Sequence, residues 1–241
     1  MALIFDKLLI QCSRVHSIMT NKEGAAYLFE LYSEYRYGKR PAIKGAPQVD
    51  RLVRGNSSEK DSTKLLSFVT GEQYYRNKKR VQSEYLTGAV DIIDAENLED
   101  ATKIVEVKTS DNQDTFCKRI FTGADKNNII QLQSYLSITG KQYGELAYCL
   151  TSYSEKVIAE QKEILFSKMC PDGIKSEKFL LKWAEIETKL RFEDIIPKDR
   201  VLLYKIERDE IMINEIHDRV KWCRDFLKNL ELKHNSLIYV K

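Results

Sequence analysis

The sequence lacks the features that mark several classes of protein. It contains no run of about 18 or more apolar residues, so it predicts no membrane-spanning helix. Its first residues carry an acid and a base within an apolar stretch, without a basic start or a small-residue cleavage site, so no signal peptide is expected. Proline is scarce, and its four residues stand at expected element boundaries.

Cysteine and histidine are too few and too scattered to form a metal cluster. The three histidines are far apart in the chain, and no two of the five cysteines are spaced as CxxC. This excludes a structural zinc site and a four-cysteine iron–sulfur cluster. Most of the five cysteines are expected to be small buried residues of a reducing compartment: Cys12, Cys117, Cys149, Cys170 and Cys223.

The charge is nearly balanced in total but unevenly placed. The 241 residues are 43% hydrophobic and 31% charged, which is enough for a substantial core, and the net charge is +3. From Arg36 to Arg80, twelve Lys and Arg stand against four Asp and Glu, a local charge of +8. This asymmetry indicates either a polyanionic partner or a solvated basic surface.

Hydrophobic periodicity predicts a mixed α/β protein, with 1–241 forming a single domain that has helical additions at both ends. Helices are expected at 20–38 and at 54–71, the second with Asn56 or Ser57 near its cap. From Glu72 to Ser110 the period changes to two, which indicates several strands. Further helices are expected at 127–140, 154–169, 175–192 and 210–232, and further strands at 145–152 and 200–209.

Ionisable residues interrupt two of the apolar strands. In "GAVDIID", strand alternation puts Asp91 on the face of Ile93 and opposite to Val90 and Ile92. In "KIVEVKTS", Glu106 and Lys108 share one face. Buried charges are costly unless they are paired or bind a metal, so the pattern indicates either a salt bridge or a functional site. Asp94, one residue beyond the apolar run, is expected in a turn.

An Asp followed on the next strand by Glu-x-Lys is typical of metal-dependent phosphodiesterases. We expect Asp91, Glu106 and the backbone carbonyl of Val107 to hold Mg²⁺ or Mn²⁺, because all three offer hard oxygen ligands. The metal would lower the pKa of a bound water and screen the phosphate. Lys108 would orient or deprotonate that water and stabilise the charge that develops on phosphorus.

Other segments, taken in order with this one, resemble the PD-(D/E)XK nuclease superfamily and its phage lambda exonuclease (YqaJ-type) branch. "RGNSSEK" is similar to the branch's Gly-x-x-x-Glu helix, which implies that Glu59 adds a carboxylate to the metal site. "IIQLQSYLSITG" is similar to its Gln-x-x-x-Tyr helix, which implies that Gln131 and Tyr135 brace Lys108 or contact phosphate. A plain amphipathic helix flank is the alternative for these two residues.

The resemblance runs from about Gln11 to Leu230 and extends to DNA contacts. "LIQCSRVHSIMT" is similar to the segment that helps to bind a 5′-phosphate in the branch, although Ser13 also suits a helix cap. No arginine stands at the branch's usual place upstream of this serine. Cations and hydroxyl groups near the site are expected to contact phosphate. The predicted DNA-binding residues are Ser13, Arg14, Arg54, Arg76, Lys78, Lys79, Thr109 and Ser110.

The resemblance implies a restriction-endonuclease-like core, with a mixed, mostly antiparallel sheet flanked by helices. It also implies a phage or prophage enzyme of the bacterial cytoplasm that degrades duplex DNA from 5′ ends. The resulting 3′ overhangs would serve a single-strand-annealing recombinase, and the protein would form a homo-oligomeric ring, a trimer. Two alternatives stay open: an endonuclease or a RecB-like or Cas4-like nuclease of the same fold, and a non-catalytic DNA-end-binding module.

Overall fold

A computed structural model describes residues 3–19, 26–38, 47–110 and 112–238. At its centre is a five-stranded sheet in the order β2-β5-β6-β7-β8. Its strands are β2 (Tyr75–Arg76), β5 (Ile92–Ile93), β6 (Ile104–Thr109), β7 (Tyr143–Cys149) and β8 (Val201–Glu207). The β6–β7 pair is parallel and the other pairs are antiparallel, so the predicted mixed, mostly antiparallel sheet and the α/β class are confirmed.

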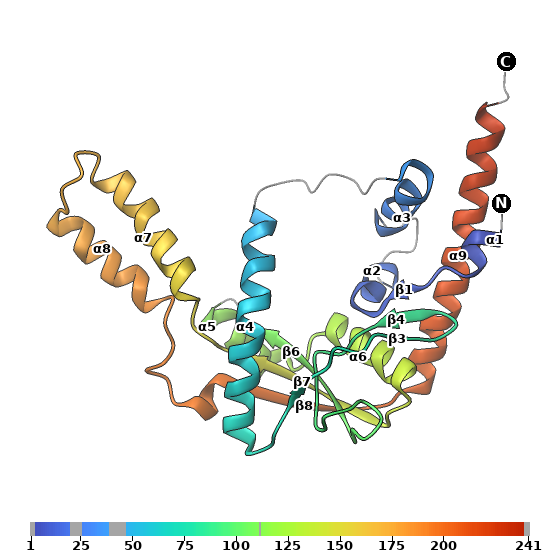
Figure 1. Ribbon diagram of the computed structural model, residues 1–241, viewed down its shortest axis with the longest axis horizontal. Coiled ribbons are helices and arrows are strands. Elements are labelled where there is room, and N and C mark those ends of the chain that lie inside the picture. The colour runs from blue at the N-terminus through green and yellow to red at the C-terminus, as the bar shows by residue number, and fades with distance from the viewer. Residues whose placement is uncertain (1–2, 20–25, 39–46, 111, 239–241) are drawn as a thin grey trace.

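Two helices cover the opposite faces of this sheet (Figure 1). Helix α4 (Pro47–Thr70) packs Leu66 against Ile92 and Val105 on one face. Helix α6 (Lys126–Thr139) packs Leu132 and Leu136 into the larger core on the other face. Because successive strand residues point to opposite faces, the apolar side chains of β6 divide between these two cores.

A second, three-stranded sheet lies beside α6 and holds the amino-terminal segment. It has the order β1-β4-β3, with β1 (Ile10–Gln11) parallel to β4 (Leu86–Gly88) and β3 (Val81–Gln82) antiparallel to it. Helices α1, α2, α3 and α9 surround this part (Figure 1). Their bounds are Leu3–Asp6, Val15–Met19, Ala26–Tyr37 and Glu210–Ile238, and a 3₁₀ turn, η1, spans Cys12–Arg14.

The remaining helices begin at polar caps and lie around the sheet. Asn112 caps α5 (Gln113–Thr122), and Ser154 and Ser176 cap α7 (Glu155–Met169) and α8 (Glu177–Thr188). Helices α7 and α8 form a hairpin with a small core of their own, which projects from the main body (Figure 1). A short 3₁₀ turn, η2 (Pro197–Arg200), leads into β8. In the described ranges, no helix is long and apolar enough to cross a bilayer.

The structure corrects several local expectations. Helix α4 begins at Pro47 rather than near Asn56, because proline is well suited to the first turn of a helix. The expected strands between Glu72 and Ile93 are short segments that belong to two sheets. Val90 packs in the same core as Ile93, because regular strand β5 begins only at Ile92 and alternation does not extend back to Val90.

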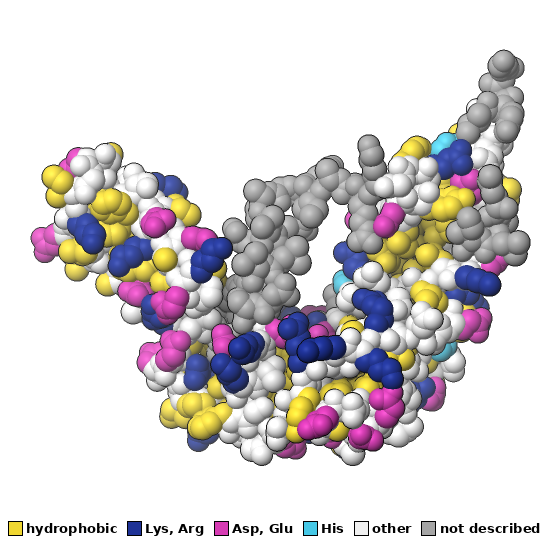
Figure 2. Space-filling model, viewed as in Figure 1, with side chains coloured by type: hydrophobic (Ala, Val, Ile, Leu, Met, Phe, Trp, Pro, Cys, Tyr) yellow, Lys and Arg dark blue, Asp and Glu magenta, His cyan; other side chains and the backbone are white. Residues whose placement is uncertain are grey.

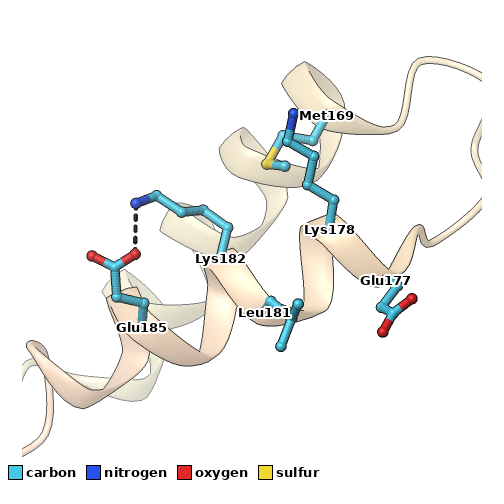
Figure 3. A pocket seen from close by; sticks show the side chains of 6 residues that line it. All are labelled: Met169, Glu177, Lys178, Leu181, Lys182 and Glu185. Atoms are coloured by element: carbon cyan, nitrogen blue, oxygen red, sulfur yellow. Dashed lines mark hydrogen bonds and ion pairs between the residues drawn. The ribbon is translucent and has the colours of Figure 1, made fainter.

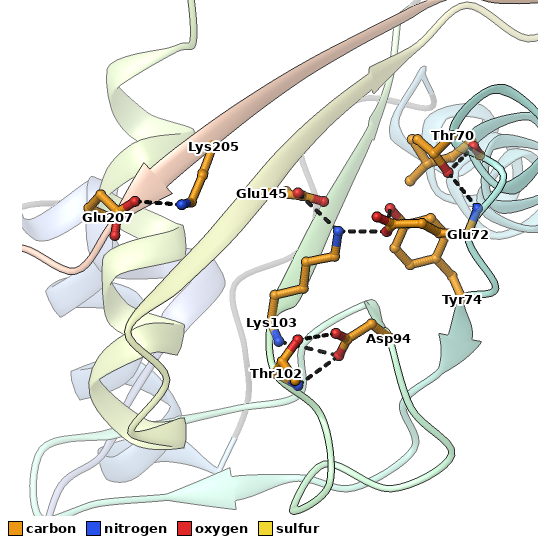
Figure 4. Close-up of polar contacts among 10 residues, drawn as sticks. Thr70, Glu72, Tyr74, Asp94, Thr102, Lys103, Glu145, Lys205 and Glu207 are labelled. Carbon is orange, nitrogen blue, oxygen red and sulfur yellow. Dashed lines mark hydrogen bonds and ion pairs between the residues drawn. The ribbon is translucent and has the colours of Figure 1, made fainter.

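A buried lysine forms an ion network with two glutamates at the start of β6 (Figure 4). Lys103 Nζ lies 2.6 Å from Glu72 Oε2 and 3.0 Å from Glu145 Oε1, and its side chain is only 8% exposed. Although burial alone would lower the pKa of Lys103, its hydrogen bonds to the two glutamates raise it overall. Nearby, Asp94 accepts hydrogen bonds from the backbone N–H groups of Thr102 and Lys103, which agrees with its expected place in a turn.

Gly88 stands where β4 closely approaches α6. A Cβ atom at this position would lie 2.7 Å from Tyr135 Cε1 and 3.0 Å from Cys12 Sγ. We therefore expect Gly88→Ala to destabilise the fold by about 1–3 kcal/mol, because a methyl group would overpack this contact. Urea unfolding measures the change, and an unaltered midpoint would show that the backbone is not so closely packed here.

Candidate active site

Three polar side chains meet where β6 faces α6. Glu106 Oε1 accepts hydrogen bonds from Lys108 Nζ at 2.7 Å and from Gln131 Nε2 at 2.6 Å. Lys108 Nζ also donates to Gln131 Oε1 at 3.0 Å, so the amide bridges the acid and the base. The glutamate is 2% exposed, and its second oxygen, Oε2, is buried without a hydrogen-bond partner among the described residues.

Asp91 lies beside this group, at the start of the neighbouring strand. Ile92 pairs with Val105 in the β5–β6 ladder, and the same register continued by one residue places Asp91 opposite Glu106. Asp91 Oδ2 accepts a hydrogen bond from the backbone N–H of Val107 at 3.0 Å. The backbone of Asp91 is held in turn by the N–H of Asn77, which donates to its carbonyl oxygen at 3.0 Å.

The two carboxyl groups and the lysine strongly affect one another's protonation. Burial, together with the negative charge of Glu106, raises the pKa of Asp91 to about 8. Burial also raises the pKa of Glu106, although Lys108 opposes the shift. Burial would lower the pKa of Lys108, but the charge of Glu106 and the hydrogen bond to it raise the pKa overall. Lys108 is therefore protonated at neutral pH and acts as a hydrogen-bond donor rather than a base in this state.

Glu59 approaches the site from α4 but pairs with a cation. Its Oε1 and Oε2 atoms lie 3.3 Å from Nε and 3.4 Å from Nη2 of Arg76, which is on β2. Over the residues that the structure describes, no three acidic, histidine or cysteine side chains form a group that could hold a metal ion. Glu59, the predicted third carboxylate of the metal site, therefore pairs with Arg76 and forms no three-carboxylate group with Asp91 and Glu106.

Tyr135 completes the α6 side of the site. Gln131 and Tyr135 are one helical turn apart, and Gln131 Nε2 lies 3.5 Å from the tyrosine hydroxyl. Both side chains are buried, with exposed fractions of 7% and 4%. Burial and the charge of Glu106 raise the pKa of Tyr135, so its hydroxyl stays protonated. Gln131 positions Lys108 through a direct hydrogen bond, and the Tyr135 hydroxyl contacts the amide of Gln131.

The hydroxyl candidates for DNA contact are divided between the surface and the interior. Ser13 is exposed in η1, whereas Ser110 is buried and its backbone N–H donates to Cys149 O at 2.8 Å. Thr109 Oγ1 lies 3.0 Å from Ser62 Oγ of α4. The backbone N–H of Ser110 is therefore already bonded within the sheet. Of the three hydroxyl candidates, only Ser13 is exposed.

The cationic candidates lie mainly at the surface. Arg14 pairs with Glu30 at 3.0 Å and stacks over the Tyr27 ring, while Lys79 pairs with Glu99. Lys78 is exposed, and the side chain of Arg54 lies outside the described residues. Lys and Arg side chains gather on the floor of the hollowed face between the α7–α8 hairpin and α9 (Figure 2). Such a surface suits a polyanion.

The residues present fit a hard divalent cation. Mg²⁺ is commonly held by one or two carboxylates together with water and substrate phosphate. Asp91 and Glu106 supply two carboxylates on adjacent strands, and the buried Glu106 Oε2 has no other partner among the described groups. An unpartnered buried carboxylate oxygen is costly, and a cation would satisfy it. Val107, whose carbonyl oxygen is the predicted third ligand, follows Glu106 in the chain, and its backbone N–H donates to Asp91 Oδ2.

Sequence reasoning missed Tyr148, which lies on β7 directly beside Lys108. Its hydroxyl accepts hydrogen bonds from the backbone N–H of Asp125 at 2.9 Å and from Asn128 Nδ2 at 2.8 Å, which ties β7 to the start of α6. Its electrostatic effect reaches Lys108. The stretch "ELAYCLTS" does show an aromatic residue in a buried strand. The sequence does not show that this strand runs parallel to β6 with Tyr148 next to Lys108.

A sizeable surface pocket lies away from these residues, on the α7–α8 hairpin (Figure 3). It has a volume of about 570 Å³. Its charged groups include the Lys182–Glu185 ion pair at 2.7 Å, and its wall includes Met169 and Leu181. Its acids and bases are exposed, and the pKa of Glu185 is lowered by surface hydrogen bonds to Lys182 and Lys189. We therefore place the chemistry at Asp91, Glu106 and Lys108, where burial shifts the pKa values of both acids.

Comparison with known proteins identifies the fold. No family model and no curated protein sequence matches the chain. Among solved structures, a phage-related exonuclease from Haemophilus somnus 129PT superposes with a TM-score of 0.65 at 19% identity, covering 95% of this chain and 97% of its own. An alkaline exonuclease from Laribacter hongkongensis gives 0.61 at 17% identity and 98% coverage of both chains, and its complex with dAMP gives 0.60 at 19% identity, covering 98% of this chain and 97% of its own. The predicted resemblance is thereby confirmed at the level of the fold: over nearly its whole length, this chain has the fold of the phage-related and alkaline exonucleases.

Proposed function

We propose that this protein is a metal-dependent deoxyribonuclease, a 5′-to-3′ exonuclease acting on ends of duplex DNA. The observation that carries the proposal is the buried Glu106, which is bonded to Lys108 and Gln131 and opposite Asp91, with one oxygen left without a partner in the described structure. A purely structural salt bridge does not require a second acid opposite the first. The shared fold with two exonucleases supports the same function.

In this proposal Asp91, Glu106 and the Val107 carbonyl hold Mg²⁺ or Mn²⁺, with Glu59 as a further carboxylate. The cation supplies positive charge that activates water and neutralises the scissile phosphate. Lys108, protonated and aimed by Gln131, donates to an oxygen of the phosphate and stabilises the negative charge that grows there. Asp91 and Glu106 must lose their protons before they can bind the cation, so alkaline conditions favour the active form.

The surface and the related folds support the choice of DNA as substrate. Lys and Arg side chains gather on the hollowed face, where their charge suits a phosphate backbone (Figure 2). We propose that Arg14, Lys78 and Lys79 are among the cations that contact DNA. An exonuclease of this fold binds dAMP, a mononucleotide of the kind that stepwise digestion of DNA releases. We further propose that the protein forms a trimeric ring in the bacterial cytoplasm, as a phage or prophage protein, and that its 3′ overhangs are passed to a single-strand-annealing recombinase.

Linear and closed circular duplex DNA of one sequence, incubated with the protein and Mg²⁺, test the reaction class. We expect only the linear form to be consumed, faster from 5′-phosphorylated than from 5′-hydroxyl ends, with mononucleotides as products. EDTA is the control, because it removes the cation. Cutting of the closed circle would favour an endonuclease, and binding of DNA ends without cleavage would favour a non-catalytic end-binding module.

A further inference from the structure

The contact between Arg76 and Glu59 joins an exposed cation to a carboxylate near the candidate cation site. The guanidinium approaches both oxygens of Glu59, at 3.3 Å from Nε and 3.4 Å from Nη2. In the β2–β5 ladder Arg76 pairs with Ile92, the residue next to Asp91. Its neighbour Asn77 bonds to the backbone of Asp91 itself. Arg76 is therefore fixed beside the site through the backbone, while its side chain is held by a residue of α4.

Glu59 is close enough to act on the two acids of the site. Burial is the main cause of the raised pKa of Asp91 and Glu106, and the negative charge of Glu59 raises both further. Nevertheless, in the described part of the chain no third carboxylate joins them in a metal-holding group. Glu59 is thus held by the Arg76 guanidinium, near the candidate cation site but outside it.

The ion pair between Arg76 and Glu59 is weak enough for Arg76 to exchange Glu59 for another anion. The Arg76 side chain is 65% exposed and that of Glu59 is 23% exposed, and ion pairs with an exposed partner contribute little to stability. Arginine binds phosphate through two parallel hydrogen bonds, as it does carboxylate, so a DNA phosphate is a direct competitor for the same donors. Exposed side chains exchange rotamers within nanoseconds, so the exchange needs no movement of the sheet.

We propose that Arg76 is a positioning residue that holds Glu59 away from the cation site until a DNA phosphate takes over its guanidinium. The proposal rests on the function proposed above and adds an order of assembly. DNA binding releases Glu59, and the released carboxylate completes the cation site next to the phosphate to be cut. Because coupling between two binding sites is reciprocal, a bound cation also raises the affinity of Arg76 for a DNA phosphate. The free protein is thereby kept from binding the cation at full strength.

Calorimetric titration with Mn²⁺ in the absence of DNA tests this directly. We expect Arg76→Ala to lower the Mn²⁺ dissociation constant about twofold to fivefold, because Glu59 is then free to join the site. In a Glu59→Gln background the same change should have no effect. Lys60→Ala, which removes an exposed cation from the same helix, is the matched control and should resemble the wild type. With a saturating short phosphorothioate duplex, the wild type should match Arg76→Ala.

Three results would overturn the proposal. One is an unchanged dissociation constant in Arg76→Ala, and another is an equal gain in Lys60→Ala, which would reflect general electrostatics. The third is a gain that persists in the Glu59→Gln background. Glu106→Gln shows whether the cation site exists at all. If this variant binds Mn²⁺ as tightly as the wild type, or if neither the wild type nor any variant binds Mn²⁺, the proposed cation site is wrong and the role of Arg76 falls with it.

Discussion

Replacing Lys108 with methionine should slow the digestion of linear duplex DNA by at least about 100-fold and leave the protein folded. Methionine keeps the length of the side chain but loses the positive charge that is held 2.7 Å from Glu106 and 3.0 Å from Gln131. Removing one positioned donor from a phosphoryl or acyl transfer site typically costs about 100-fold to 1,000-fold in rate. Release of acid-soluble nucleotide under single-turnover conditions measures the loss.

Two further variants separate chemistry from stability. Lys189→Met removes an exposed lysine at the end of α8 and should cleave DNA as the wild type does. In Lys108→Met, the Glu106 carboxylate stays buried without the lysine ammonium group that paired with it. Adding Glu106→Gln should therefore recover part of any stability lost, because the glutamine carries no charge. A Lys108→Met enzyme that digests DNA at the wild-type rate would remove Lys108 from the mechanism.

Asp91→Asn should stabilise the metal-free protein increasingly as the pH rises. Burial and the charge of Glu106 raise the pKa of Asp91 from 3.8 to about 8 in the folded state. The protonated acid therefore favours folding below about pH 4, and this contribution is lost as the pH rises from about 4 to about 8. Asparagine has no charge to bury and can still accept the hydrogen bond from the N–H of Val107.

At about pH 8 the gain in free energy of unfolding should reach at least about 1.4 kcal/mol, which is the value of one pKa unit. Urea unfolding in EDTA, repeated between about pH 5 and about pH 8, follows the difference between the two proteins. Asp94→Asn is the matched control, because Asp94 accepts three hydrogen bonds and the pKa of its carboxyl is lowered rather than raised. A difference that stays constant with pH would mean that Asp91 ionises normally in the fold.

Much of the central arrangement follows from local pattern. Period-two alternation predicts that Glu106 and Lys108 share one face of a strand, and in the structure their side chains are hydrogen-bonded to each other. The four-residue spacing of Gln131 and Tyr135 likewise predicts that they share a helix face, and Gln131 Nε2 contacts both Glu106 Oε1 and the Tyr135 hydroxyl. Such predictions succeed because strand and helix periods are fixed by backbone geometry and do not depend on distant segments.

What the sequence did not predict depends on contacts between distant segments. The pairing of Glu59 with Arg76 joins α4 to β2, and the Lys103 network joins three segments that are far apart in the chain. Each outcome is decided by tertiary packing, which local propensity does not encode.

The most direct test compares wild-type protein and Glu106→Gln on a linear, 5′-phosphorylated duplex in Mg²⁺. The substitution keeps the size of the side chain and its contacts to α6 but removes the charge that would hold the cation. Our account predicts steady release of mononucleotides by the wild type, and none above the level seen in EDTA for the variant. Equal release by the two proteins, or release that continues in EDTA, would contradict it.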